Sequence, residues 1–225
     1  MKLKYTSLAL GASAALAASS NAALVQWQAE VGNGTSAASS LFSTVSTPQE
    51  FNVGSLTASR TFEFIVNAGL GGGSSALLGD SILGGPRQGL KFEQSADTGR
   101  YGITNFGVAD FTSTAAATIN TDIHLAFVFD GTDTVIYENG ISVATMASVS
   151  LTLTDTVGLG GARNATAPAG FFDVMDGDIL GFASYDSALS GAEITAHSDA
   201  FAVPEPSSTA LLGLGGLALI MRRRK

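Results

Sequence analysis

The densest group of potential metal ligands is the acidic run at residues 173–178, which reads DVMDGD. Asp173, Asp176 and Asp178 each carry a hard carboxylate oxygen, the ligand type that Ca²⁺ prefers in proteins. A solvated acidic turn would contain the same residues, because a few acids constrain coordination only weakly. Ca²⁺ is therefore the one cofactor candidate, with a plain surface turn as the alternative.

Hydrolytic chemistry finds little support in the sequence. A retaining glycosidase needs two carboxylates about 5 Å apart, and no Glu-x-Asp-x-x-Glu run, which would place them on one strand face, is present. His124 begins an expected strand, and His197 falls on the buried stripe of an expected helix. No GxSxG elbow supports a nucleophile, although a dispersed Ser-His-Asp site stays open. The sequence therefore predicts a protein that is not an enzyme.

Sugar binding would need exposed aromatic rings that stack on pyranose faces, with a few polar groups to orient the ligand. The candidates are Tyr101, Phe106, Phe111 and Tyr185. The alternative for each is a place in the core, because Phe and Tyr bury large areas in β-sandwiches. We therefore predict that each of the four residues contacts a ligand if its ring is exposed.

These residues must be positioned by strands, and residues 122–146 show the clearest ones. Residues 124–129 alternate, which places Leu125, Phe127 and Phe129 on one face and Ala126 and Val128 on the other. Because both faces are apolar, we expect the sheet to be covered on both sides. A turn at residues 130–133 leads to a second run at residues 134–138.

Asn139-Gly140 then predicts a type I′ hairpin turn, since both central residues need positive φ. The register that follows pairs the flanking residues as Glu138 with Ile141, Tyr137 with Ser142, and Ile136 with Val143.

Period-two patterns predict the other strands. We expect strands at residues 24–29, with Trp27 in the core, and at 61–66, 89–94, 100–105, 106–111 and 177–186, with a return beginning at 155–161 and core positions at Phe171-Phe172. The glycine-rich residues 69–75 predict a loop. Ser190 and Glu193 form a capping box, and a helix follows in which Ile194, His197 and Phe201 share one face.

The stretch HLAFVFDGTDTVIYENGISVATM resembles a region of laminin-G-like domains, and GDILGFASYDSALSGAEITAHSDAF at residues 177–201 resembles their closing strand and helix. The resemblance covers about a third of the mature chain, in the expected order. It implies an all-β fold: the two-sheet antiparallel jelly roll of concanavalin A-like lectins and glucanases, with a short helix after the last strand. Such domains often hold Ca²⁺ at a sheet rim.

Composition and charge limit the expected partners of the protein and the source of its stability. Between residues 23 and 202 there are 5 basic and 18 acidic residues, so the formal charge is 5 − 18 = −13. A surface this acidic repels phosphate backbones, which excludes nucleic acid as the expected partner. Cysteine is absent, so stability must come from the core, which a domain of roughly 180 residues is large enough to supply.

The N-terminus predicts a secretory signal peptide. Lys2 and Lys4 precede an apolar, small-residue stretch at residues 7–18, and Ser20-Asn21-Ala22 supplies small residues for cleavage after Ala22. A membrane helix is the alternative, but a span takes about 20 apolar residues. We therefore expect an exported protein.

The C-terminal residues 203–225 have three parts: Pro204-Glu205-Pro206, an apolar run at residues 207–221, and the basic end Arg222-Arg223-Arg224-Lys225. This order resembles the PEP-CTERM sorting signal of bacterial envelope proteins. The resemblance implies an exosortase-like sorting protease as partner, cleavage near the prolines, and association with exopolysaccharide systems. The alternative is an ordinary tail anchor.

The apolar run predicts a C-terminal helix with transient membrane insertion and an inner-membrane sorting intermediate. Fifteen helical residues at ~1.5 Å each reach about 22 Å, which is marginal against a bilayer core of roughly 30 Å.

The expected organisation is a signal peptide at residues 1–22, a laminin-G-like sandwich at 23–202 and a sorting tail at 203–225. The expected function is a non-catalytic protein of the cell envelope or extracellular matrix that binds polysaccharide or a cell-surface protein. Two alternatives stay open: a structural or adhesive protein without a discrete ligand, and a diverged glycan hydrolase.

Overall fold

The computed structural model describes residues 45–53, 58–81, 87–95, 99–164 and 170–202. The predicted signal peptide with Ala22, the predicted strand at residues 24–29 and the sorting tail with Pro204, Glu205, Pro206 and its arginines lie outside these residues. The elements are β1 Gln49–Asn52, β2 Ser59–Ala68, β3 Ser75–Ser81, β4 Arg87–Glu93, β5 Arg100–Asn105, β6 Ala109–Ala116, β7 Ile123–Asp130, β8 Thr134–Glu138, β9 Ile141–Met146, β10 Thr156–Leu159, β11 Ala162–Asn164, β12 Gly170–Phe172, β13 Gly177–Tyr185 and α2 Gly191–Ala202.

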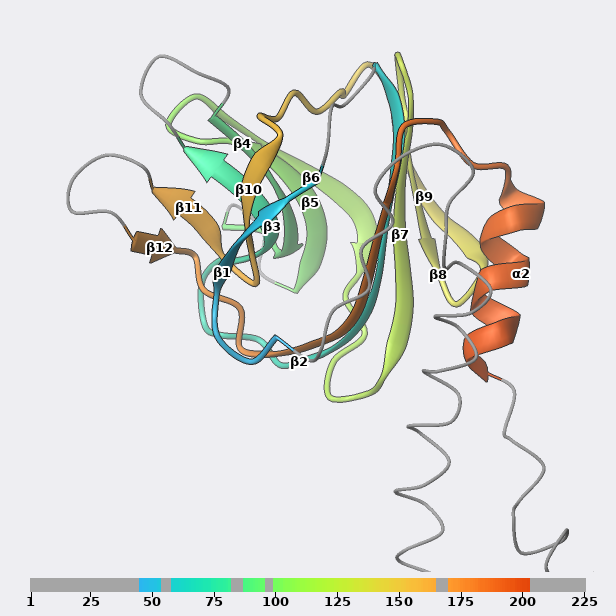
Figure 1. The fold of residues 1–225 in the computed structure, drawn as a ribbon, viewed down its shortest axis with the longest axis horizontal. Coiled ribbons are helices and arrows are strands. Elements are labelled where there is room, and N and C mark those ends of the chain that lie inside the picture. Colours follow the sequence, from blue (N-terminus) through green and yellow to red (C-terminus); the bar gives the residue numbers. More distant parts are fainter. Residues whose placement is uncertain (1–44, 54–57, 82–86, 96–98, 165–169, 203–225) are drawn as a thin grey trace, which may run out of the picture.

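The strands form two packed sheets, as the sequence predicted (Figure 1). One sheet has five strands in the order β13-β2-β7-β8-β9. The other has eight, in the order β1-β10-β3-β4-β5-β6, with β11 and β12 attached beside β3. Pairing is antiparallel throughout except for the short β11–β3 contact, which is parallel. The all-β jelly-roll sandwich is therefore confirmed.

The main core lies between the sheets and follows from strand alternation. Phe64 on β2, Phe127 on β7 and Phe182 on β13 are all fully buried. Their rings touch, with centroids 6.5 Å apart for Phe64 and Phe127 and 5.2 Å for Phe64 and Phe182. Burying one such side chain contributes about 1.5–3 kcal/mol, so the alternating apolar positions supply the main driving force for the two layers.

The outer face of the five-stranded sheet is also covered, by helix α2 (Figure 1). Ala126 and Val128 of β7 pack there with Ile194 of the helix, while Leu125 and Phe127 of the same strand face the main core. The prediction that both faces of this sheet are covered is confirmed. The capping box also forms, because Glu193 accepts a hydrogen bond from the Ser190 backbone N–H at 2.8 Å.

The hairpin between β8 and β9 differs from the predicted register at one pair. Asn139 and Gly140 adopt φ values of 49° and 78°, as the turn requires. Glu138 pairs with Ile141 and Tyr137 with Ser142, but a bulge then places Ile136 opposite Ala144. The predicted Ile136–Val143 pair is wrong, because the bulge brings the small Ala144 into the core and leaves Val143 36% exposed.

Two further differences concern the eight-stranded sheet. Strand β3 is wholly buried and has no predicted counterpart in the sequence, because a strand buried on both faces loses its alternation. Phe106 does not begin a strand. It lies in a turn, where its N–H donates to the Arg87 carbonyl at 2.6 Å and β6 starts only at Ala109.

A row of glycines crosses the eight-stranded sheet and lets other segments lie on it. Gly158, Gly79 and Gly89 are neighbours on β10, β3 and β4. A Cβ at Gly158 would lie 2.3 Å from the Gly161 carbonyl oxygen, and one at Gly89 would lie 2.9 Å from Cζ of Phe106. The absence of side chains in this row therefore allows β11, β12 and the Phe106 turn to pack directly against the sheet.

Candidate functional site

The outer face of the eight-stranded sheet, the face turned away from the other sheet, carries a group of charged side chains. On β4, Leu90 and Phe92 enter the core, so Lys91 and Glu93 must point to the outer face. Both charged residues are nonetheless buried, with 0% and 1% exposure. Charged side chains are almost never fully buried without partners, so Lys91 and Glu93 need polar partners within the protein.

Lys91 is held by two loops. Its ammonium donates hydrogen bonds to Ser74 Oγ at 2.5 Å and to the carboxylate of Asp173. It also lies 5.4 Å from the centre of the Phe106 ring, within the range of a cation–π contact. Burial lowers the pKa of Lys91, while the hydrogen bond to Asp173 acts in the opposite direction. Lys91 thus ties the 69–74 loop and the turn after β12 to the sheet.

Glu93 is only partly satisfied. Its Oε2 accepts a hydrogen bond from the Gly71 N–H at 3.0 Å. Among the described residues, its buried Oε1 has no hydrogen-bond partner, and neither has the buried hydroxyl of Ser75, its cross-strand neighbour on β3. We call Ser74, Lys91, Glu93 and Asp173 the polar cluster; it combines fixed charges with unused hydrogen-bonding capacity.

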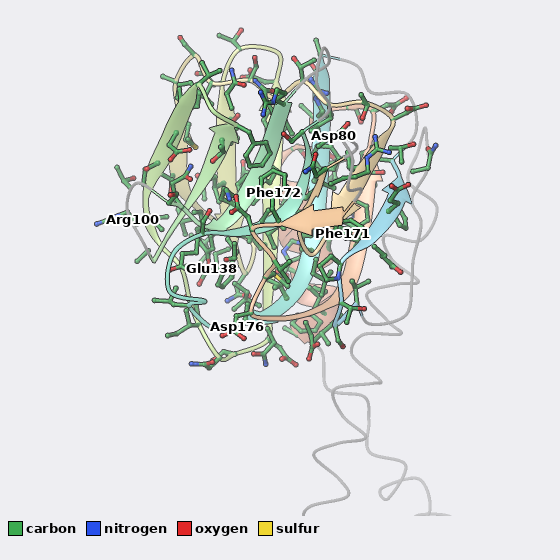
Figure 2. All side chains as sticks on the ribbon, turned by 90° about the vertical axis from the view of Figure 1, so that its left-hand side faces the viewer. Asp80, Arg100, Glu138, Phe171, Phe172 and Asp176 are labelled. Atoms are coloured by element: carbon green, nitrogen blue, oxygen red, sulfur yellow. The ribbon has the colours of Figure 1, made fainter. Side chains whose placement is uncertain are left out.

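Aromatic rings lie beside this cluster. The Phe106 and Phe172 rings are 4.9 Å apart in an edge-to-face contact, and Phe171 and Phe172 are partly exposed. Figure 2 looks onto this face and shows β12, with both residues labelled, crossing in front of the sheet, with Asp176 toward one end of the face. We call Phe106, Phe171 and Phe172 the aromatic ledge. Phe106 contacts both Lys91 and Phe172, so it joins the ledge to the buried polar cluster.

The four aromatic residues predicted to bind a ligand lie in different places. Tyr101 is fully buried and donates a hydrogen bond to Glu138 at 2.6 Å, which links the two sheets. Tyr185 is 3% exposed beneath α2, and Phe106 is 6% exposed within the ledge. Only Phe111 is exposed, at 38%. Tyr101, Tyr185 and Phe106 are corrected to buried residues, because a buried ring offers no face for stacking.

The three candidate metal ligands also differ in their surroundings. The Asp173 carboxylate accepts from Lys91, and its backbone is in the left-handed region with φ of 49°. Asp176 is exposed and its carbonyl accepts from the Gly69 N–H, while Asp178 pairs with Asn67 inside the sheet. Within the described ranges, no three acidic or histidine side chains gather in a way that could hold a metal ion. An ammonium, that of Lys91, neutralises Asp173.

A second buried polar group lies under helix α2. Glu63 on β2 is fully buried, with His197 Nδ1 at 3.0 Å and His124 Nε2 at 3.3 Å from its oxygens. Tyr185 stacks on the His197 ring at 6.1 Å. Burial by itself would raise the pKa of Glu63, but the hydrogen bonds from His124 and His197 outweigh it and hold that pKa below its usual value. This cluster fastens the helix to the sheet.

The family follows from this fold together with a match to a family model. Residues 43–195, more than half of the chain, match the model of the concanavalin A-like lectin/glucanases superfamily. The chain belongs to this superfamily. Residues 202–225 match the PEP-CTERM protein-sorting motif, which implies processing by an exosortase and indicates export and sorting to the cell envelope. A comparison with curated proteins found no match.

Solved structures show the same superfamily fold. The leech intramolecular trans-sialidase is 14% identical with a TM-score of 0.52, and the match covers 71% of this chain and 27% of that one. Domain 4 of the arabinanase AbnA from Geobacillus stearothermophilus is 15% identical with a TM-score of 0.50, covering 65% and 69%. A mutant NanB sialidase from Streptococcus pneumoniae is 16% identical with a TM-score of 0.50, covering 69% and 27%. This chain therefore spans about a quarter of each of the two sialidase chains.

Sequence reasoning named Phe106 and Asp173 but missed the other residues of this superfamily member's candidate site. Lys91 is the only lysine between residues 23 and 202, and its alternation with Leu90 and Phe92 could have placed it outside the core. The predicted core positions of Phe171 and Phe172 are wrong, since both side chains are partly exposed, and their placement had no such signal. It depends on β12 lying across the glycine row, a contact between segments about 80 residues apart.

No helix among the described residues is long and apolar enough to cross a membrane. The predicted membrane insertion concerns the apolar run at residues 207–221, which lies outside the described residues.

Proposed function

We propose that this protein is an exported, non-catalytic carbohydrate-binding protein of the cell envelope, and that the outer face of the eight-stranded sheet is its binding surface. The observation that carries the proposal is the contact between the aromatic ledge and the polar cluster. Lys91 Nζ lies 5.4 Å from the Phe106 ring, which lies 4.9 Å from that of Phe172. Sugar sites combine an apolar ring face with a few fixed polar groups in this way.

The fold supports a carbohydrate ligand. The superfamily description names lectins, and the similar arabinanase domain has arabinotriose bound in its structure. At 15% identity this likeness shows the fold alone. The partly exposed Phe171 and Phe172 are the residues placed to stack on a sugar.

A non-catalytic role is supported by three carboxylates that hold structural contacts. Glu63 holds two histidines, Asp80 binds Arg163 at 3.2 Å, and Glu138 accepts from Tyr101. Each carboxylate therefore serves a structural contact, whereas a glycosidase needs two that face one substrate. Incubating the protein with any glycan it binds should release no new reducing ends.

The binding test is a polysaccharide array probed with the full chain in detergent. Phe172→Ala should weaken the signal about two- to tenfold, because it removes a ring that offers a stacking face, and stacking of one ring contributes about 0.5–1.5 kcal/mol beyond area burial. Phe111→Ala is the matched control. Phe111 is exposed but pairs with the core residue Ile103, so it belongs to the opposite face of the same sheet.

Two results would count against this assignment. A blank array would favour the structural or adhesive alternative. A signal lost in Phe111→Ala and kept in Phe172→Ala would place the ligand on the other side of the sheet.

The sorting tail gives the protein a second partner. We propose that an exosortase-like protease cleaves near Pro204-Glu205-Pro206 while the apolar run is inserted in the inner membrane. Replacing these three residues by Ala-Gln-Ala should trap the full-length chain in the inner-membrane fraction. Unchanged fractionation and unchanged molecular mass would contradict the proposal.

A further inference from the structure

We infer that the outer face selects glycans by charge: it binds amino sugars more tightly than their neutral counterparts and rejects acidic ones. This inference depends on the proposed function and adds the chemical class of the ligand.

The first observation is unused acceptor capacity at one point of the face. Glu93 Oε1 and Ser75 Oγ are both buried and, among the described residues, both lack a hydrogen-bond partner. They are neighbours, since Ser75 and Glu93 are directly opposite each other on β3 and β4. A carboxylate only accepts hydrogen bonds, and an ammonium group carries three donors and no acceptor. The group that best completes this site is therefore one that donates and carries a positive charge.

The second observation is the local charge. Lys91 is the only cation of the polar cluster, and the carboxylates of Asp173, Asp110 and Glu93 all act on it. With the exposed Asp176 beside Gly69 and Gly71, the local sum is 1 − 4 = −3. Of the other cations on this side, Arg163 on β11 lies opposite Phe171, but Asp80 and Glu50 both pair with it and offset its charge. Arg87 lies four residues away on β4, about 13 Å along the strand. At that distance salt screens most of its effect.

The third observation concerns access to Glu93 and Ser75. The loop above them contains Gly71, Gly72 and Gly73, and a Cβ at Gly72 or Gly73 would have no atom within 4 Å. Two hydrogen bonds to the polar cluster hold this loop, from Gly71 N to Glu93 and from Lys91 to Ser74 Oγ. A ligand amine can replace the first of these, because glycine tolerates the backbone change that displaces the loop.

The experiment compares glucan backbones that differ only in charge. The probes are β-1,4-, β-1,3- and α-1,4-linked glucans, in which C6 is free, each as the unmodified polymer, the 2-amino-2-deoxy form and the C6-carboxylate form. On every backbone that binds, the amino form should bind about tenfold more tightly than the neutral form, the gain expected for one charge-assisted hydrogen bond. The acidic form should not bind, and the difference should shrink in 0.5 M salt.

Three variants separate the site from the overall charge. Glu93→Gln should reduce the preference for the amino form about tenfold. Asp176→Asn, at an exposed position that leaves the fold intact, should reduce it by a smaller factor. Glu50→Gln removes the same charge from β1, where Glu50 is 59% exposed beside Arg163, and should leave the preference unchanged.

The outcomes are distinguishable. No binding to any form would overturn the proposed function itself. Binding to acidic glucans at least as tight as to amino glucans would overturn only the charge selection. An equal effect of Glu93→Gln and Glu50→Gln would also overturn it, because the preference would then reflect the acidic surface as a whole.

Discussion

The attachment of helix α2 to the five-stranded sheet should depend on the charge of Glu63. The substitution Glu63→Gln keeps the shape of this fully buried side chain and removes its charge. In the wild type, the carboxylate receives hydrogen bonds from His197, with Nδ1 at 3.0 Å, and from His124. Each hydrogen bond to a charged group contributes about 1.5–3 kcal/mol, and glutamine can keep one neutral bond of about 1 kcal/mol. The expected loss is about 2–5 kcal/mol.

Thermal and urea denaturation at pH 7 measure this loss. For a domain of this size, 1 kcal/mol lowers Tm by about 2–4 °C, so a loss of about 3 kcal/mol corresponds to roughly 6–12 °C. Amide hydrogen exchange should show that α2 loses protection before the core strands, because Glu63 holds the helix and not the core. Glu50→Gln, at an exposed position, is the control and should stay within about 0.5 kcal/mol of the wild type.

The pH dependence of stability in the wild type and in Glu63→Gln tests whether the charge of Glu63 causes this loss. The pKa of Glu63 is lower in the folded state than its ordinary value of 4.5. Its contribution is therefore fully present above that value and is lost as pH falls through the lower folded-state pKa. The stability difference between the wild type and Glu63→Gln should be present from pH 7 to about 5 and shrink below that. A difference under about 0.5 kcal/mol at pH 7, or one that does not change down to pH 3, would refute the reasoning.

Two further predictions concern the outer face of the eight-stranded sheet. Gly158→Ala should destabilise the domain by about 1–3 kcal/mol, because the added Cβ would lie 2.3 Å from the Gly161 carbonyl oxygen. The control Gly73→Ala meets no atom within 4 Å and should leave stability unchanged. Equal urea midpoints for the two variants would show that β11 does not pack on the glycine row. Removing Ca²⁺ with EDTA should leave Tm unchanged, because Lys91 already neutralises Asp173. A lower Tm in EDTA would instead place a cation at Asp176 or Asp178.

Much of the fold could be predicted because it depends on local patterns. The alternation of Leu125, Phe127 and Phe129 against Ala126 and Val128 reflects strand geometry, and it correctly predicted a sheet covered on both faces. The Asn139-Gly140 turn and the capping box at Ser190 are equally local, since each depends on residues no more than three apart. Strand β3 was missed because a strand buried on both sides carries no alternation.

The candidate site could not be predicted from local patterns, because its contacts join residues that are far apart in the chain. Lys91 meets Asp173, 82 residues later, and Glu63 meets His197, 134 residues later. The sequence showed acidic residues at 173–178 and two histidines. It could not show that Lys91 neutralises Asp173, or that the buried Glu63 binds both His124 and His197.

The sequence by itself determined the class of fold, the order of its strands along much of the chain and the presence of the sorting motif. Each of these depends on residues that are close together in the sequence. The tertiary structure alone decided which aromatic rings face outward. Tyr101 and Tyr185 have the same local pattern as exposed strand residues, yet packing against the second sheet and against α2 buries them. Burial is a property of what covers a residue, and the covering segment is supplied by a distant part of the chain.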